Sequence, residues 1–340
     1  MSESALDWPA IRAAAGKLEQ GGLVAFPTET VYGLGADAEN PQAIAKIYAA
    51  KGRPSNHPVI VHLAPGADID YWATAIPGQA FELIDAFWPG PLTLILKRAP
   101  NIPDAVSGGQ DSIGLRCPSH PVAQALLRTF KNGKGGLAAP SANRFGHVSP
   151  TTAQHVRDEF GAGLDGILDG GQSEVGIEST ILDLSRTATH GPVLLRPGHI
   201  GAARIADAIG VAPRLPDTAA PRASGTLDSH YAPRTPAILM EAVALPGLLQ
   251  KLAGAGRKVA LISHTLPHLS DITAQFALPG SPEGYAYQLY AALRTMDSAS
   301  ADIILIETPP AGDAWQGIND RLRRAVHGSA GVLSRLVTPS

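Results

Sequence analysis

The chain has 340 residues, a formal net charge of −3 and 44% hydrophobic residues. This length suits about two domains, and the hydrophobic content excludes a disordered protein. The slight negative charge excludes a global basic field that would attract nucleic acid or a membrane surface.

Cysteine content and the ends of the chain bear on its location. The single cysteine, Cys117, excludes internal disulfides and favours a reducing compartment. The first seven residues are acidic and lack the apolar centre of a signal peptide. No apolar run reaches the roughly 18 residues of a membrane span. We therefore expect a cytoplasmic protein without a membrane partner.

The stretch 26–35 is the most informative one. It follows a predicted helix over 9–20 and a predicted buried strand over 21–26. It carries three hydroxyl side chains, one carboxylate, and two glycines, Gly33 and Gly35, which let the backbone bend or approach a ligand closely. A strand that ends in such groups is typical of ligand sites at the sheet edges of α/β proteins.

A helix over 41–51 and a strand over 58–63 follow. Asn40 suits the N-cap of that helix, and Gly52 suits the position just past its end. Two cations stand at this helix end, next to the hydroxyl-rich stretch. They are Lys51 and Arg53.

The remainder of the first half alternates helices and strands. Ser149 is expected to cap a helix, since Pro150 follows it. Helices are predicted over 81–88 and from Pro121, and strands over 91–97, 111–116, 135–140, 166–168, 179–184 and 193–198.

The second half restarts the pattern after a proline-rich break. Residues 211–236 contain five prolines and no hydrophobic period, as a linker does. Beyond it, strands over 237–241, 257–263 and 302–306 alternate with helices over 245–254, 283–296 and 317–326. The predicted fold class is α/β, with a twisted mixed sheet in 1–210, a linker or lid in 211–236, and a smaller Rossmann-like parallel-sheet domain in 237–340.

The sequence lacks the motifs of several common classes of enzyme. Gly133-Lys134 has neither the earlier glycine nor the following hydroxyl of a Walker A loop. The stretch 33–38 mimics a dinucleotide fingerprint but lacks the acidic residue about 20 positions on. No metal-binding spacing and no serine-hydrolase elbow is present. His62, alone on a strand, is by itself more typical of a structural histidine.

Cations recur at the ends of predicted elements. Arg53, Arg116 and Arg196 follow or end strands and helices, together with Lys51. Surface ion pairs and helix caps would explain any one of these residues. Three arginines among hydroxyls at strand ends instead favour a ligand with several negative groups, such as a nucleoside triphosphate with an amino-acid carboxylate. The hydroxyls are Thr30, Ser112, Ser141, Ser149, Ser179 and Thr180.

Eight segments in this order resemble the YrdC-like domain of the threonylcarbamoyl-AMP synthases. They are 27–34, 51–54, 58–62, 88–93, 116–121, 139–143, 179–181 and 196–198. The second half, with 230–233 in the linker and 315–325 near its end, resembles the long form of these enzymes, which has an additional C-terminal α/β domain.

The resemblance implies that L-threonine, bicarbonate or CO2, and ATP with Mg²⁺ give L-threonylcarbamoyl-AMP and pyrophosphate. It implies that other proteins then transfer the threonylcarbamoyl group to the adenosine beside the anticodon of tRNA, with at most weak tRNA contact by this chain. Neither carbamate formation nor attack on the α-phosphorus requires a side-chain nucleophile, so positioning and charge neutralisation could supply the catalysis.

The resemblance also implies site residues, position by position. Lys51, Arg53 and Arg116 are the expected catalytic cations, with Arg116 on the threonine carboxylate. The expected threonine-binding residues are Thr30, His62, Arg116, Ala139 through its backbone, and Ser179. The expected ATP-binding residues are Lys51, Arg53, His57, Ser112, Ser141, Asn143, Ser149, Arg196 and Tyr231. No protein side chain is assigned to a metal.

Two departures and two alternatives accompany this expectation. His57 stands where many relatives have asparagine, and 223–229 lacks the basic residues that relatives often carry there. One alternative is a carbamoyl-transfer enzyme of hydrogenase maturation, whose cysteine-rich fingers one cysteine cannot form. The other is a non-catalytic binder of double-stranded RNA, which a net charge of −3 disfavours.

Overall fold

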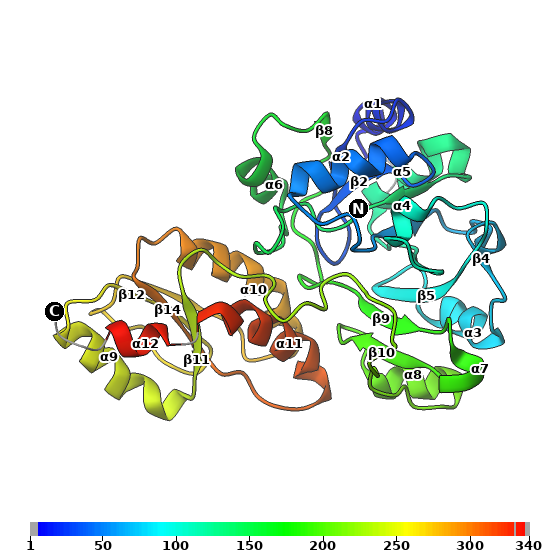
Figure 1. Cartoon of the computed structure of the whole chain (residues 1–340). Helices are drawn as coiled ribbons and strands as arrows, with labels where there is room; N and C mark the ends of the chain where they lie inside the picture. The colour runs from blue at the N-terminus through cyan, green and yellow to red at the C-terminus, as the bar shows by residue number, and fades with distance from the viewer. Residues whose placement is uncertain (1–5, 330, 337–340) are drawn as a thin grey trace. The chain divides into compact units, whose positions relative to one another are not determined.

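The computed structural model describes residues 6–329 and 331–336, and the chain divides into two compact units (Figure 1). The first unit comprises the chain up to Phe145 together with Ser149–Thr226. The second comprises Gly146–Val148 and the chain from Leu227 onward. Of the predicted linker, residues 211–226 thus lie in the first unit and 227–236 in the second.

The first unit is built on a ten-stranded mixed sheet. Its strand order is β10-β9-β5-β6-β3-β7-β2-β1-β8, with β4 paired to β5 off this path. The strands are β1 (Val24–Phe26), β2 (Gly33–Asp37), β3 (Ile60–Leu63), β4 (Ala73–Thr74), β5 (Leu92–Arg98), β6 (Ser112–Arg116), β7 (Gly136–Ala138), β8 (Gly166–Ile167), β9 (Thr180–Asp183) and β10 (Val193–Arg196). β3 pairs with β6 in parallel, whereas β5 pairs with β6 antiparallel. The predicted mixed sheet is therefore confirmed.

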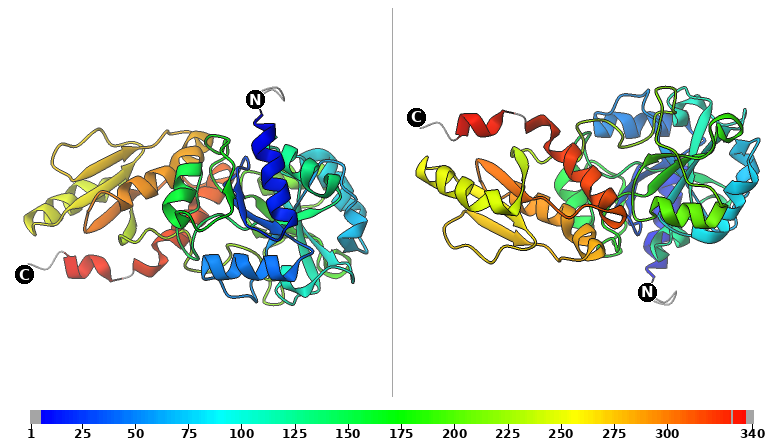
Figure 2. Two further views of the ribbon diagram at one scale, coloured as in Figure 1. Left: turned by 90° about the horizontal axis from the view of Figure 1, so that it is seen from above. Right: turned by 90° about the horizontal axis from the view of Figure 1, so that it is seen from below.

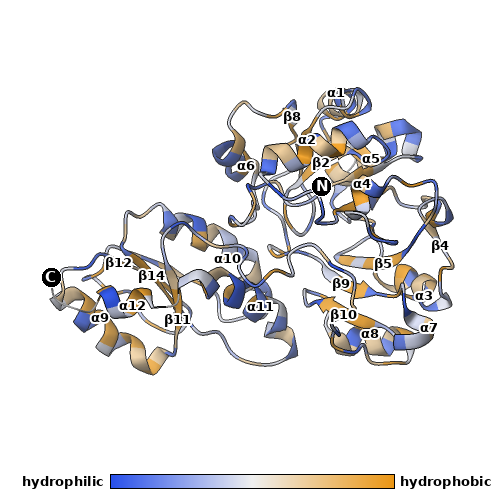
Figure 3. Ribbon diagram, viewed as in Figure 1, coloured by the Kyte–Doolittle hydropathy of each residue, from blue (hydrophilic) through white to orange (hydrophobic). Residues whose placement is uncertain are grey.

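Helices cover both faces of this sheet (Figure 2). They are α1 (Trp8–Glu19), α2 (Pro41–Lys51), α3 (Gly78–Phe87), α4 (Asp104–Ser107), α5 (Pro121–Thr129), α6 (Ala153–Phe160), α7 (Thr187–His190) and α8 (Ala202–Ile209). One hydrophobic core joins α2, α3 and α8 to the sheet, for example through Ile44, Leu83 and Ile205. A second core joins α1 and α5 to Phe26 and Leu137. The sheet strands are accordingly rich in hydrophobic residues in Figure 3.

Both ends of α2 follow the sequence prediction, and the start of α6 does not. The Asn40 side chain accepts hydrogen bonds from the N–H groups of Gln42 and Ala43, and Gly52 has a left-handed φ of 63°. Ser149 does not cap α6, because Thr152 occupies that position and accepts from the N–H of His155. The predicted cap at Ser149 is therefore wrong by three residues.

The polar stretch after β1 contains a strand that the sequence did not predict. β2 returns antiparallel to β1, with Phe26 opposite Gly33. A Cβ at Gly35 would lie 2.8 Å from the Phe26 ring, and one at Gly33 would lie 3.2 Å from the Ala139 Cβ. These glycines therefore permit close packing of β2 against its neighbours, rather than a bend of the backbone.

The second unit is an open parallel sheet with the strand order β11-β14-β12-β13 (Figure 1). Its strands are β11 (Ala237–Met240), β12 (Val259–Ser263), β13 (Ala274–Ala277) and β14 (Ile303–Glu307), and its helices are α9 (Leu245–Gly254), α10 (Pro282–Asp297), α11 (Gln316–Val326) and α12 (Val332–Leu336). The predicted Rossmann-like sheet is confirmed. β13 was not predicted, because its side chains are only partly buried and it has no apolar run.

Candidate active site

Strand alternation in the first unit places the polar candidates on one face of the sheet. Along β6, Ser112 and Arg116 are four residues apart and therefore point to the same face of the sheet, and His62 stands opposite Arg116 in the parallel β3. Ile60 and Ile95 belong to an apolar cluster that is separate from the main core. This face, here called the site face, therefore combines buried polar groups with an apolar floor.

Arg196 reaches this face because β10 is irregular. The pairing of β10 with β9 shifts register between Leu194 and Arg196. A regular strand would turn Arg196 to the same side as Leu194, which belongs to the main core. The bulge re-aims Arg196 instead, and its guanidinium donates to the Ser179 carbonyl from Nε at 3.1 Å and from Nη2 at 2.9 Å.

A hydroxyl pair continues this contact. Ser179 Oγ lies 2.7 Å from Thr93 Oγ1 and accepts from Arg196 Nη2 at 3.2 Å. All three side chains are buried. Ser179 and Arg196, predicted separately for threonine and for ATP, thus lie in one network, and Thr93 is a member that the sequence prediction missed.

Arg116 and His62 form the second group on the site face. Arg116 Nη2 lies 2.7 Å from the Glu29 carboxylate, and each side chain is 4% exposed. Burial, with a further contribution from the Arg116 charge, lowers the pKa of His62 to about 3. His62 is therefore neutral at physiological pH. Thr30 lies in the same stretch as Glu29, with its Oγ1 2.9 Å from that of Thr28.

Lys51 lies at the end of α2, where its ammonium is enclosed by carbonyl groups. Nζ donates to the backbone oxygens of Ser141 and Asn143. Complete burial, and secondarily the Arg53 charge, lowers the pKa of Lys51 well below its usual value. Lys51 therefore fixes the loop that carries two other predicted ATP-binding residues.

Arg53 and Arg196 share one contact with the segment that follows residue 210. Arg53 Nη2 donates to the Pro58 carbonyl at 2.8 Å, and Nη1 lies 3.4 Å from Ser224 Oγ. Arg196 Nη1 donates to the Ser224 carbonyl at 2.7 Å. Ser224 also lines a small cavity with Ser112 and the apolar floor. Residues around Ser224 therefore lie over the site face within the first unit.

The remaining candidates of the first unit lie around these groups. Ser149 Oγ donates to the Glu178 carboxylate at 2.5 Å. The ring of His57 packs on Phe145, and burial lowers the pKa of His57. The Ala139 N–H donates to the Ile60 carbonyl at 2.9 Å, so its own carbonyl is the backbone group that it could offer a ligand.

Tyr231 lies in the second unit and is described within it. It is 1% exposed and has a left-handed φ of 61°. The Arg321 guanidinium lies 5.5 Å from the centre of its ring, and Tyr290 packs on the ring at 5.8 Å. The position of Tyr231 is thus determined by side chains of α10 and α11.

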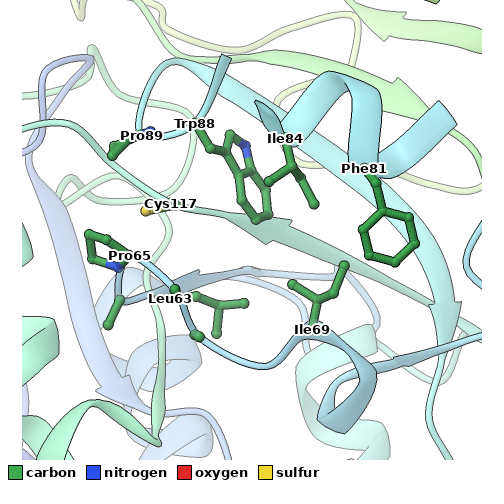
Figure 4. A pocket seen from close by; sticks show the side chains of 11 residues that line it. Leu63, Pro65, Ile69, Phe81, Ile84, Trp88, Pro89 and Cys117 are labelled. Carbon is green, nitrogen blue, oxygen red and sulfur yellow. The ribbon is translucent and has the colours of Figure 1, made fainter. Parts of the chain in front are cut away.

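An apolar pocket of about 240 Å³ opens near the ends of β3 and β6 (Figure 4). Leu63 and Cys117 line it, each one residue after a site-face residue, and Phe81 and Ile84 of α3 line the other side. Since successive strand residues point to opposite faces, Leu63 points away from His62. The pocket has no charged lining residue and is separate from the site face.

The structure thus brings nearly all first-unit candidates to one region, and it adds three that the sequence prediction did not assign. Glu29, Thr93 and Glu178 each contact a predicted site residue directly. Glu29 lies within the stretch 26–35, so its place in that stretch is the sequence feature that could have identified it as a site residue. Cations, hydroxyls and a neutral histidine thus lie around one apolar floor, an arrangement that favours a ligand with both carboxylate and phosphate groups.

Comparison with known proteins identifies the family. Residues 16–198 match the family model described as telomere recombination, and residues 200–326 match the C-terminal domain of threonylcarbamoyl-AMP synthase. The threonylcarbamoyl-AMP synthase of Pyrococcus abyssi is 38% identical over 328 residues, covering 93% of each chain. That of Bacillus subtilis is 39% identical over 332 residues, covering 94% of each.

A solved structure agrees with this assignment. Pyrococcus abyssi Sua5 complexed with L-threonine superposes with a TM-score of 0.86 at 37% identity, covering 94% of each chain. The chain belongs to the threonylcarbamoyl-AMP synthase family, in its two-domain form. Within residues 6–329 and 331–336, no helix has the length and hydropathy needed to cross a membrane.

Proposed function

We propose that the chain makes L-threonylcarbamoyl-AMP and pyrophosphate from L-threonine, bicarbonate or CO2, and ATP. The observation that carries this proposal is the assembly of Arg116, His62, Ser179 and Arg196 on one buried sheet face, with Lys51 and Arg53 in the same unit. Membership of the family and the threonine named for the Pyrococcus relative support the same reaction.

The chemistry follows from what these groups offer. The threonine amine loses a proton and adds to CO2, which gives a carbamate. A carbamate oxygen then attacks the α-phosphorus of ATP, and the bond from that phosphorus to the bridging oxygen breaks to release pyrophosphate. Each step requires alignment and neutralised charge rather than a covalent intermediate, so fixed cations can supply much of the acceleration.

The proposed role of each residue follows from its charge and its hydrogen-bonding groups. Arg116 binds the threonine carboxylate, and Lys51, Arg53 and Arg196 neutralise ATP oxygens. The neutral ring of His62 can share a hydrogen bond with threonine without adding a charge. Thr30, Ala139 and Ser179 complete the threonine site. His57, Ser112, Ser141, Asn143 and Ser149 complete the ATP site of the first unit.

Mg²⁺ would enter with ATP. The described part of the chain holds no cluster of three or more histidine, cysteine, aspartate or glutamate side chains that could bind a metal. Mg²⁺ in phosphate sites commonly keeps several waters and takes its other ligands from substrate phosphates and one or two carboxylates. The ion would neutralise charge on the departing pyrophosphate.

The product is a mixed anhydride whose threonylcarbamoyl group is activated for transfer. We therefore propose that tRNA-modification proteins accept it for the adenosine beside the anticodon, in the cytoplasm. A net charge of −3 supports at most a weak contact of this chain with tRNA.

Pyrophosphate release by the purified chain tests the function. We expect release in Mg²⁺ only when ATP, L-threonine and bicarbonate are all present. Arg116→Ala should abolish the dependence on threonine, and Arg116→Lys, which keeps a cation beside Glu29, should lose most of it. Release that is indifferent to threonine, or no release under any combination, would contradict the proposal.

The segment around Ser224 is proposed to move when ATP binds. Ser224 contacts both Arg53 and Arg196, two residues that are assigned here to ATP. Nucleotide oxygens would compete for the same guanidinium groups. Limited proteolysis between residues 211 and 226, with and without ATP and threonine, should show different cleavage rates. Equal rates would contradict this movement.

A further inference from the structure

Glu29 is the one carboxylate of the stretch 26–35, and the roles proposed above do not use it. It is 3% exposed, between Thr28 and Thr30. Its backbone carbonyl accepts from the Val175 N–H at 2.7 Å, so the main chain is fixed at this residue. A buried carboxylate is costly unless its oxygens have partners.

One oxygen of Glu29 is in an ion pair at the end of β6, and the other accepts a hydrogen bond just beyond that end. Oε1 lies 2.7 Å from Arg116 Nη2, and Oε2 accepts from the Ser119 N–H at 3.1 Å. The backbone contact to Ser119 fixes the carboxylate, and the fixed carboxylate in turn determines the position of Nη2. The hydrogen bond from the main chain therefore holds the Glu29 carboxylate in place independently of Arg116.

Arg116 is held at two corners of its guanidinium. Nε donates to the Gly90 carbonyl at 3.3 Å, and Nη2 faces Glu29. Nη1 makes no hydrogen bond to any residue that the structure describes. A guanidinium has five donors in a rigid plane, so fixing two corners determines the direction of the third.

We propose that Glu29 is a positioning residue, which orients Arg116 so that Nη1 meets the substrate carboxylate. This inference rests on the proposed function, because it requires Arg116 to bind that carboxylate. Arginine loses rotamer freedom when it is fixed. Glu29 imposes this loss before the substrate arrives, which favours binding. It also offsets the charge of the buried Arg116 until the substrate carboxylate enters.

Glu29→Gln tests the proposal, since it keeps the shape and removes the charge. We expect the KM for L-threonine to rise about tenfold and the KM for ATP to change by less than about twofold. Equilibrium binding of L-threonine alone, by calorimetry, should weaken by the same factor. Glu39→Gln is the matched control, because Glu39 pairs with Lys131 in the same unit and contacts none of the proposed site residues. It should leave both constants unchanged.

Two further measurements separate positioning from general structure. In an Arg116→Ala background, Glu29→Gln should produce no additional loss of threonine affinity, because its effect passes through Arg116. L-threoninamide lacks the carboxylate charge, so the wild type and Glu29→Gln should bind it equally. Glu29→Asp keeps the charge and should restore part of the threonine affinity.

Other outcomes overturn the inference. Glu29→Gln that weakens ATP and threonine equally, or that adds fully to Arg116→Ala, would show a structural role only. Threonine-dependent pyrophosphate release by the wild type supports the proposed function whatever the variants do. Absence of that release would remove the proposed function, while the calorimetric comparison of threonine with threoninamide would still test Glu29.

Discussion

Arg116 at the end of β6 and Glu307 at the end of β14 are both buried charged residues, yet the two units use them differently. Glu307 accepts from the N–H groups of His264 and Thr265, at 2.7 and 3.0 Å, and from the Thr265 hydroxyl. Burial acts to raise the pKa of Glu307, but these hydrogen bonds lower it below its usual value. Arg116 keeps one nitrogen without a partner among the described residues.

The comparison shows how the charge of Arg116, proposed to bind a ligand, differs from a structural charge. Both positions lie at the carboxyl end of a strand, where α/β proteins bind ligands. In the second unit, the neighbouring loop donates hydrogen bonds to both oxygens of the Glu307 carboxylate, so this charge stabilises the loop. In the first unit part of the hydrogen-bonding capacity of Arg116 remains, so the charge is available to a substrate. Four predictions test this difference, from the largest expected effect to the smallest.

His62 should make the first unit sensitive to acid. Its pKa is about 3 in the folded protein and about 6.5 in the unfolded chain. A depressed folded pKa contributes stability that is present above pH 6.5 and lost as the pH falls toward 3. At pH 4 the loss should be about 3 kcal/mol. His62→Gln should remove this acid-dependent part, as measured by urea titration with pulse proteolysis at pH 4 to 7.

His190→Gln is the control for this experiment, because its side chain is 43% exposed and its pair with the equally exposed Asp217 should contribute little to stability. A His62→Gln variant that loses stability in acid as steeply as the wild type would show that the buried neutral ring does not govern the profile. Other titratable groups would then determine how the stability of the first unit depends on pH.

Glu307→Gln should destabilise the second unit without affecting catalysis. The amide cannot accept from all three donors, so about 2 kcal/mol of local stability should be lost. Hydrogen exchange in β12 and β14 should report this loss, while the kcat and both KM values remain unchanged. A rise in either KM with unchanged exchange would show that Glu307 serves the substrate, and the comparison would fail.

Much of the fold could be predicted from the sequence, because the signals were local. Asn40, Pro41 and Gly52 delimited α2, and the alternation beyond residue 236 gave the parallel sheet. β2 could not be predicted, because its residues are glycine-rich and its stability comes from pairing with β1 and β7. Gly35 is required because the Phe26 ring packs against it, and this contact is visible only in the structure.

The site shows the same limit. The cations and hydroxyls could be picked out as residue types near predicted strand ends. Their pairing could not, because it depends on tertiary geometry. The bulge that turns Arg196 toward Ser179 and the ion pair of Glu29 with Arg116 join residues 17 and 87 positions apart. Neither contact leaves a period or a motif in a single sequence.

Lys51 should couple ATP binding to proton uptake. Burial lowers the pKa of Lys51 well below its usual value, and bound phosphate would raise it again. ATP should therefore bind more weakly as the pH rises between these two values, by at most about 1.4 kcal/mol per pH unit. Calorimetry in two buffers with different ionisation enthalpies should detect the uptake. Lys51→Arg, which stays charged, should abolish it; equal uptake in this variant would assign the proton to another group.

Arg323→Ala should have the smallest effect. Asp320 pairs with Arg321, Arg323 and Arg324, but the Arg323 side chain is 64% exposed, whereas the other two are 8% exposed or less. Exposed pairs contribute little, and Asp320 keeps two partners, so hydrogen exchange in α11 should change by about 0.5 kcal/mol or less. The KM for ATP should not change. A tenfold rise would mean that the cations of the second unit also bind ligand, so that a charge can have its partners within the fold and still serve the substrate.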